Sequence, residues 1–212
     1  TDLITFCEDK VLKILANKDA LFNADGNSNL TSTNRVLGQA VPFVGDYGIS
    51  KNPESFACYA FRMYFADKNR GAILRLSRDG LTPISEIGMG DYFRDNLPLA
   101  TTILGSYDDS KGLYNITLGK VNQTLSFDEK TNGWPSFKSF VPEGGESLNN
   151  IYYTIKNGDI WFHTNTALRN NFYGDQYESS VNVLINDEAD TIKGFKTVNY
   201  SGSRSRKYTK DY

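Results

Sequence analysis

The sequence has little of the chemistry that marks most metal and catalytic sites. Its 212 residues include one histidine, His163, and two cysteines, Cys7 and Cys58. Zinc ligands usually come in closely spaced pairs, and these residues lie far apart in the chain. No apolar run reaches the roughly 18 residues that a membrane-spanning helix needs. We therefore expect no zinc site and no membrane span.

Charge of either sign is also unremarkable. Twenty-three basic residues face 25 acidic ones, and the formal net charge is −2. A nucleic-acid-binding surface requires a clear basic stripe, and only residues 203–207 are locally basic. We interpret that stretch as a solvated strand end or tail. The sequence therefore predicts no nucleic-acid partner.

Aromatic residues are abundant instead. The chain has 13 Tyr, 13 Phe and two Trp. Each can bury roughly 150–250 Å², so they can dominate a core without disulfides. Tyr and Phe also suit pleated, half-buried surfaces, which favours β-structure. We interpret Cys7 and Cys58 as small apolar residues within strands.

Polar turns that end in glycine punctuate the chain. Glycine accepts the positive φ of tight turns, and Asn157–Gly158 is a strong hairpin signal. Between the turns the apolar residues alternate with a period of two, which is typical of strands. Ala72, Leu74 and Leu76 share one face, and Tyr114, Ile116 and Leu118 share another. The predicted turns span residues 67–71, 78–80, 108–112, 128–133 and 157–158.

Further elements follow from the same reasoning. We expect strands at 2–7, 10–16, 36–44, 179–185 and 192–200, with the first two forming a hairpin. A helical insert is predicted at 84–97, capped by Ser85, although Gly88 and Gly90 weaken it. Its core-facing residues would be Ile87, Tyr92, Phe93 and Leu97. A second short turn is predicted at 167–171, and surface loops at 17–34 and 142–150.

Together these elements predict a mainly β fold of antiparallel hairpins in a meander, with β-propeller-like blades and one or two short helical inserts. A blade takes roughly 40–50 residues, so about four would fit. So few blades would leave sheet edges open, and other chains would have to cover them. Because a strand already begins at Asp2, we expect residues 1–212 to be one β-rich segment of a longer polypeptide.

A series of short stretches follows in this order: KNPESF at 51–56, FRMYFAD at 61–67, RGAILRLSRDG at 70–80, GSYDD at 105–109, LSFDE at 125–129, GWPSFKSF at 133–140, NNFYG at 170–174 and FKTVNY at 195–200. Together these stretches resemble large structural proteins of tailed bacteriophages. Residues 67–77 are also similar to the propeller-bearing tail nozzle proteins of short-tailed phages. The resemblance covers roughly residues 40–200 and implies a virion protein of the tail, baseplate, neck or fibre. It does not imply a catalytic site, and we expect neither an enzyme nor a cofactor.

Such a protein would act through contacts with copies of itself and with neighbouring virion proteins. Aromatic residues beside Asn and Gly at 148–153 and 172–177 are candidate interface segments, because Tyr and Phe provide interface energy at low conformational cost. Ordinary core packing is the alternative for the same residues. The candidate interface residues are Leu148, Tyr152, Tyr153, Phe172, Tyr173 and Tyr177.

Other constellations point more weakly to function. We interpret His163 as a structural strand residue, because no nucleophile turn accompanies it. Asn23, Asp25, Asn27 and Asn29 offer oxygen ligands at alternate positions, but the calcium-loop pattern is broken and a polar turn is the favoured interpretation.

Two alternative functions stay open. Trp134, Trp161, Tyr152 and Tyr153 could stack sugars in a receptor- or glycan-binding module that meets a host surface glycan. Asp108, Asp109, Asp128 and Glu129 could serve a glycan depolymerase, although carboxylates at these positions usually cap turns.

Overall fold

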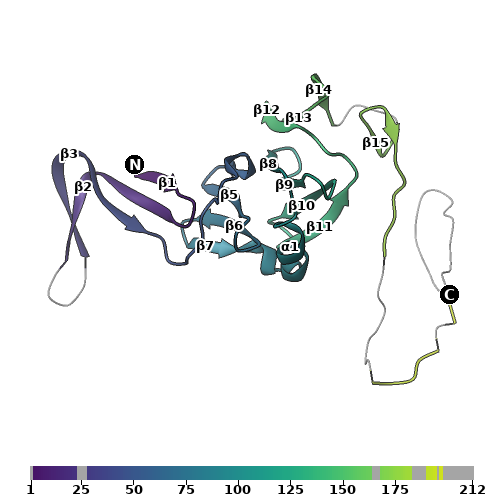
Figure 1. Ribbon diagram of the computed structural model, residues 1–212, viewed down its shortest axis with the longest axis horizontal. Helices are drawn as coiled ribbons and strands as arrows, with labels where there is room; N and C mark the ends of the chain where they lie inside the picture. The colour runs from purple at the N-terminus through teal and green to yellow at the C-terminus, as the bar shows by residue number, and fades with distance from the viewer. Residues whose placement is uncertain (1, 23–27, 164–167, 183–189, 195, 198–212) are drawn as a thin grey trace. The chain divides into compact units, whose positions relative to one another are not determined.

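The computed structural model describes residues 2–22, 28–163, 168–182, 190–194 and 196–197. Figure 1 shows the chain, which divides into one compact unit at residues 1–178 and a second at 179–212. The strands of the described residues all lie in the first unit and pair antiparallel. One α-helix accompanies them, so the predicted mainly β, antiparallel fold is confirmed.

The chain opens with a three-stranded sheet, which we call sheet N. Its strands follow one another as β1 (Leu3–Phe6), β2 (Val11–Phe22) and β3 (Ser28–Pro42). The predicted opening hairpin is confirmed, with Phe6 opposite Val11.

The surface loop predicted at 17–34 is wrong in its described part. Strands β2 and β3 continue as a long hairpin in which Lys18 lies opposite Ser32. Backbone pairing along the hairpin outweighs the weak strand preference of Asn, Asp and Ser side chains. Residues 23–27, which carry most of the calcium-loop hypothesis, lie outside the described residues.

Two four-stranded meanders follow, in each of which neighbours in the chain are neighbours in the sheet. The predicted turns at 67–71, 78–80, 108–112 and 128–133 connect their strands, as expected. Sheet I consists of β4 (Ala57–Tyr59), β5 (Arg62–Asp67), β6 (Ala72–Ser77) and β7 (Gly80–Pro83). Sheet II consists of β8 (Ile103–Asp108), β9 (Leu113–Leu118), β10 (Gln123–Asp128) and β11 (Gly133–Lys138).

Short helices lie around these two sheets: η1 (Pro53–Ser55), η2 (Ile84–Glu86) and α1 (Gly90–Asn96). The continuous helix predicted at 84–97 is wrong in its middle, because Gly88 takes a φ of +75° that ends the first turn. The predicted cap is also wrong, since Met89 precedes α1 and Ser85 lies within η2. Phe93 and Leu97 are fully buried, as predicted.

A third meander, sheet III, consists of β12 (Gly144–Leu148), β13 (Ile151–Lys156) and β14 (Asp159–Phe162). The loop predicted at 142–150 is therefore wrong. Gly145 allows β12 to lie close to β8, because a Cβ on Gly145 would lie 3.1 Å from the Ser106 side chain of β8. The predicted turn at Asn157–Gly158 is confirmed, with φ values of 54° and 81°.

A small hairpin, β15 (Asn171–Phe172) and β16 (Asp175–Gln176), ends the first unit. The turn predicted at 167–171 is present over the described residues 168–170. The strands predicted at 179–185 and 192–200 are wrong where the chain is described, since residues 179–182, 192–194 and 196–197 form no ladder. Alternating apolar residues make a strand only when a neighbouring strand supplies hydrogen bonds.

The sheets contact one another in chain order. One core cluster joins sheets I and II, and a second joins sheets N and I. Strand β6 serves both, because Ile73 lies in the first cluster and Leu74 in the second. The predicted faces are confirmed: Ala72, Leu74 and Leu76 share the second cluster, and Tyr114, Ile116 and Leu118 share the first.

Sheet III meets sheet II through β12 and β13, which both contact β8. The Ser106 hydroxyl of β8 lies 2.7 Å from the Tyr152 hydroxyl of β13. Strand β8 also contacts β4, so the first strand of sheet II lies beside the first strands of sheets I and III. Successive meanders with adjacent first strands are typical of propeller blades. The described sheets form no closed ring, so a closed propeller stays a prediction.

Candidate subunit interface

An aromatic cluster fills the space between sheet III and the β15–β16 hairpin. Its centre is Phe140, which is 3% exposed. The ring of Phe140 lies 4.7 Å from that of His163 and 5.2 Å from that of Phe172. Tyr173 and Tyr177 extend the cluster, with the Tyr177 ring 6.1 Å from Phe172.

Hydrogen bonds fix the hairpin to sheet III. The Tyr173 hydroxyl donates to Thr154 Oγ1 at 2.9 Å, and Thr154 is fully buried. The same oxygen lies 2.6 Å from His163 Nε2. The Tyr177 amide donates to the Asn170 carbonyl at 2.9 Å, which closes the hairpin. The β15–β16 hairpin is thus attached to sheet III by packed aromatic rings and by a hydrogen bond to the buried Thr154 hydroxyl.

The cluster disfavours added positive charge. Burial, followed by the nearby Lys111 and Lys138, lowers the pKa of His163 to about 4. Burial, followed by Lys111, lowers the pKa of Lys138 to about 8. At neutral pH the imidazole is therefore neutral. His163 packs in the cluster and hydrogen-bonds with Thr154, as the structural interpretation predicted, but it lies just past the end of β14 and not within a strand.

Sheet III has a second, outward face on the side away from the cluster. Along β13, Tyr152 and Thr154 point inward and are buried, whereas Ile151, Tyr153 and Ile155 alternate with them. Ile155 lies opposite Ile160, and Tyr153 opposite Phe162. We call this the outer face of sheet III; it carries Leu148, Ile151, Tyr153, Ile155, Ile160 and Phe162.

The outer face of sheet III is apolar and open to solvent. Ile160 is 74% exposed, Leu148 65% and Phe162 51%. Glu146, opposite Tyr153, is the charged residue on this face. Soluble proteins rarely leave contiguous apolar surface uncovered, and such surface marks interaction sites.

Five of the six predicted interface residues divide into two groups, and the sixth, Tyr152, lies in the core. Phe172, Tyr173 and Tyr177 lie partly exposed around the aromatic cluster, whereas Leu148 and Tyr153 lie on the outer face of sheet III. Tyr152 is 2% exposed and packs inward, as the core-packing alternative predicted. Burial raises its pKa to about 12.

Sequence reasoning did not select Ile155, Ile160 and Phe162 as interface residues. The alternation of Ile151, Tyr153 and Ile155 was the available signal. Alternation shows that residues share a face, but it does not show which face of a sheet the rest of the chain covers.

A cavity of about 420 Å³ lies beside the aromatic cluster. Trp161, His163 and Tyr173 contribute aromatic walls, and Arg169 and Asn170 contribute polar groups. Trp134, the other candidate for sugar stacking, instead donates its Nε1–H to the Ile84 carbonyl at 3.0 Å and packs on Phe93. Of the two tryptophans, Trp161 thus lines a cavity and Trp134 belongs to the core.

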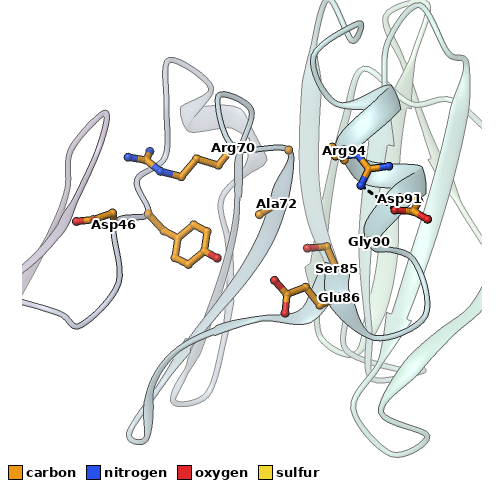
Figure 2. Close-up of a pocket in the computed structure, with 10 residues that line it drawn as sticks. Asp46, Arg70, Ala72, Ser85, Glu86, Gly90, Asp91 and Arg94 are labelled. Atoms are coloured by element: carbon orange, nitrogen blue, oxygen red, sulfur yellow. Dashed lines mark ion pairs between the residues drawn. The ribbon is translucent and has the colours of Figure 1, made fainter.

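A second cavity, of about 490 Å³, lies next to sheet I (Figure 2). Both of its arginines are engaged by carboxylates: Arg94 pairs with Asp91 at 2.8 Å, and Arg70 with the buried Asp67 at 3.1 Å. Within the described residues, no three His, Cys, Asp or Glu side chains gather as a metal site would require. Among the described residues that line this cavity, both arginines thus already pair with a carboxylate.

The turn carboxylates hold local structure. Asp108 accepts from the Ser110 hydroxyl at 2.7 Å, and Asp128 from the Lys130 amide at 2.8 Å. Glu129 differs, because it accepts from the Tyr64 hydroxyl at 2.8 Å and pairs with Arg75 at 2.8 Å. The bonds of Asp108 and Asp128 agree with the turn interpretation, whereas those of Glu129 join sheet II to sheet I. Cys7 and Cys58 are both free thiols.

Residues 168–211 match the family model of the Crassvirus muzzle protein C-terminal domain. The match places the chain in the tail-associated part of a phage virion. It covers the β15–β16 hairpin, so Phe172, Tyr173 and Tyr177 lie within the segment that resembles the muzzle domain. The resemblance to structural proteins of tailed phages is supported to this extent.

A search of curated protein sequences gives no match. Within the described residues, no helix of the virion protein is long and apolar enough to cross a lipid bilayer.

Proposed function

We propose that the chain is a building block of a phage tail that acts through contacts with neighbouring virion subunits and catalyses no reaction. The observation that carries this proposal is the open apolar face of sheet III. The same sheet anchors the muzzle-like hairpin on its opposite side, through Thr154 and the aromatic cluster. A sheet held rigidly on one face and apolar on the other suits docking to a partner.

Assembly of particles in host cells tests the proposal. The chain should be found in purified tail-containing particles by mass spectrometry, and cryo-electron microscopy should place it in the tail. Ile160→Lys puts a charge on the outer face of sheet III and should sharply lower incorporation. Val44→Lys is the matched control, because Val44 is 95% exposed and lies outside the strands. Particles that never contain the chain would refute the proposal.

A glycan-binding role is the second candidate, and the cavity beside Trp161 favours it. Aromatic walls with neighbouring Asn and Arg side chains suit the stacking and hydrogen bonding of a sugar. Binding to a glycan array should be lost in Trp161→Ala and kept in Trp134→Phe, which leaves the cavity unchanged. If the wild-type chain binds no glycan from the host surface, this candidate fails.

A further inference from the structure

Sheet N also carries an uncovered apolar face. Ile4 and Phe6 point inward against sheet I, so Leu3 and Thr5 point outward. We call this second surface the outer face of sheet N. Cross-strand pairs place these residues on it: Leu3 with Ile14, Thr5 with Leu12, Leu12 with Pro42, Ile14 with Ala40, and Ala16 with Leu37.

These residues are uncharged and partly open to solvent. Leu37 is 54% exposed and Leu3 48%. Leu12 and Ile14, on the middle strand, are half-buried. The chain thus has an apolar three-stranded sheet face at each end of its series of sheets, one on sheet N and one on sheet III.

From these two surfaces we propose that a second copy of this chain docks head-to-tail, with the outer face of sheet III of one copy packed on the outer face of sheet N of the next. This proposal rests on the proposed function and names the partner.

The contacts inside one chain support this choice. Sheet N packs its inner face on sheet I, sheet I packs on sheet II, and sheet II contacts sheet III. Each contact joins a sheet to the next one along the chain. A second copy would continue the same face-to-face series, because its sheet N presents an apolar face of three strands to sheet III.

The distribution of the two faces also favours a second copy over an unrelated partner. Each copy carries both faces, so a single type of contact covers both of them. Contacts of this head-to-tail kind are heterologous, and they close into rings when the rotation between copies permits.

Two single substitutions on the full 212-residue chain test the proposal. Ile160→Lys places a charge on the outer face of sheet III, and Leu37→Lys places one on the outer face of sheet N. Burying either lysine without a partner is unfavourable, so each variant should weaken self-association by at least about tenfold. Both side chains are exposed in one copy, so urea unfolding of each variant should match the wild type.

Sedimentation velocity over a range of concentrations gives the readout. The wild-type chain and Val44→Lys should shift to larger species as concentration rises, while each of the two face variants stays monomeric. An equimolar mixture of Ile160→Lys and Leu37→Lys should form a dimer and nothing larger. In that mixture, one variant supplies an intact sheet III face and the other an intact sheet N face, which make one contact.

Three outcomes would overturn the proposal. The wild-type chain could remain monomeric up to about 100 μM, a concentration at which even a weak specific contact would be visible. Ile160→Lys could abolish association while Leu37→Lys has no effect, which would show that sheet III pairs with itself. Both variants could associate as the wild type does, which would place the contact elsewhere.

A monomeric wild-type chain that still enters particles, and loses incorporation with Ile160→Lys, would leave the proposed function standing. In that case the outer face of sheet III would bind a different virion protein.

Discussion

Stacked tyrosine rings and a partly buried hydrogen bond hold sheets I and II together. Tyr64 of sheet I stacks on Tyr114 of sheet II at 4.7 Å, and Tyr59 of sheet I stacks on Tyr107 of sheet II at 4.4 Å. Burial, with the Glu129 carboxylate beside it, raises the pKa of Tyr64. The hydroxyl therefore stays protonated and donates to Glu129 at any physiological pH.

Replacing Glu129 tests this link. Glu129→Ala removes the acceptor of Tyr64 and the partner of Arg75, whose side chain is only 19% exposed. Leaving such groups unpaired should lower the free energy of unfolding by about 2–3 kcal/mol, measured by urea denaturation. Glu146→Ala, on the exposed outer face of sheet III, should change it by less than about 0.5 kcal/mol. Equal losses in the two variants would contradict the argument.

Glycine at position 105 permits a close approach of backbones. A Cβ there would lie 1.9 Å from the carbonyl oxygen of Ser55, which is far closer than two atoms that are not bonded to each other can approach. Gly105→Ala must therefore push β8 away from η1 and should cost about 3 kcal/mol or more of unfolding free energy. Gly90→Ala is the matched control, because a Cβ there meets nothing within 4 Å. It should be neutral or slightly stabilising at the start of α1, and a similar loss in both variants would refute the steric explanation.

At the scale of elements, the β15–β16 hairpin depends on a neutral imidazole. The unfolded chain binds a proton on His163 near pH 6.5, whereas in the folded chain its pKa is about 4. Between these values the unfolded state holds more protons, so stability should fall as pH is lowered from about 6.5 towards 4.

Chemical denaturation at pH 7 and pH 5 tests this dependence. The wild-type chain should lose about 1 kcal/mol of unfolding free energy at pH 5, less than the full pKa shift implies because solvent partly screens the ring. His163→Gln keeps a hydrogen-bonding group near Thr154 but cannot titrate, so it should lose much less. An unchanged loss in His163→Gln would assign the pH dependence to carboxylates instead.

The two faces of sheet II are covered by different kinds of side chain. The face towards sheet I is aromatic and aliphatic. The face on the other side buries hydroxyl and amide groups that bond one another: Thr117 and Thr124 lie 2.7 Å apart, and the Ser126 hydroxyl donates to Asn115 at 2.6 Å. The sequence alternation placed Tyr114, Ile116 and Leu118 on the first face, while nothing in the sequence indicated that the polar face is buried. Their burial depends on what packs above them.

At the scale of the whole molecule, sheets I and II share one core and should unfold together. Phe93 of α1 is fully buried and packs on Trp134 of β11, with ring centres 4.6 Å apart. Phe93→Ala should cost about 3–5 kcal/mol. Native-state hydrogen exchange should show an equal loss of protection for the amides of β6 and β9. A loss confined to one of the two sheets would show that each sheet is stable by itself.

The sequence alone determined the local structure, because turns and strand faces depend on neighbours in the chain. Asn157–Gly158 supplied the positive φ of a hairpin, and a period of two placed Leu74 on one face with Ala72 and Leu76, and Ile116 on one face with Tyr114 and Leu118. The predicted loops were wrong where local signals conflict with tertiary contacts, as at Gly145 and in the long β2–β3 hairpin. Weak strand formers become strands there because another strand pairs with them or approaches closely.

Only the tertiary structure decided which apolar faces stay open. Tyr152 and Tyr153 are identical side chains in adjacent positions, yet one is buried against Ser106 and the other lies on the outer face of sheet III. Sequence periodicity separates the two faces of a strand but carries no information on which of them another sheet will cover. That choice depends on the packing of sheets far apart in the chain, and it decides where a partner can bind.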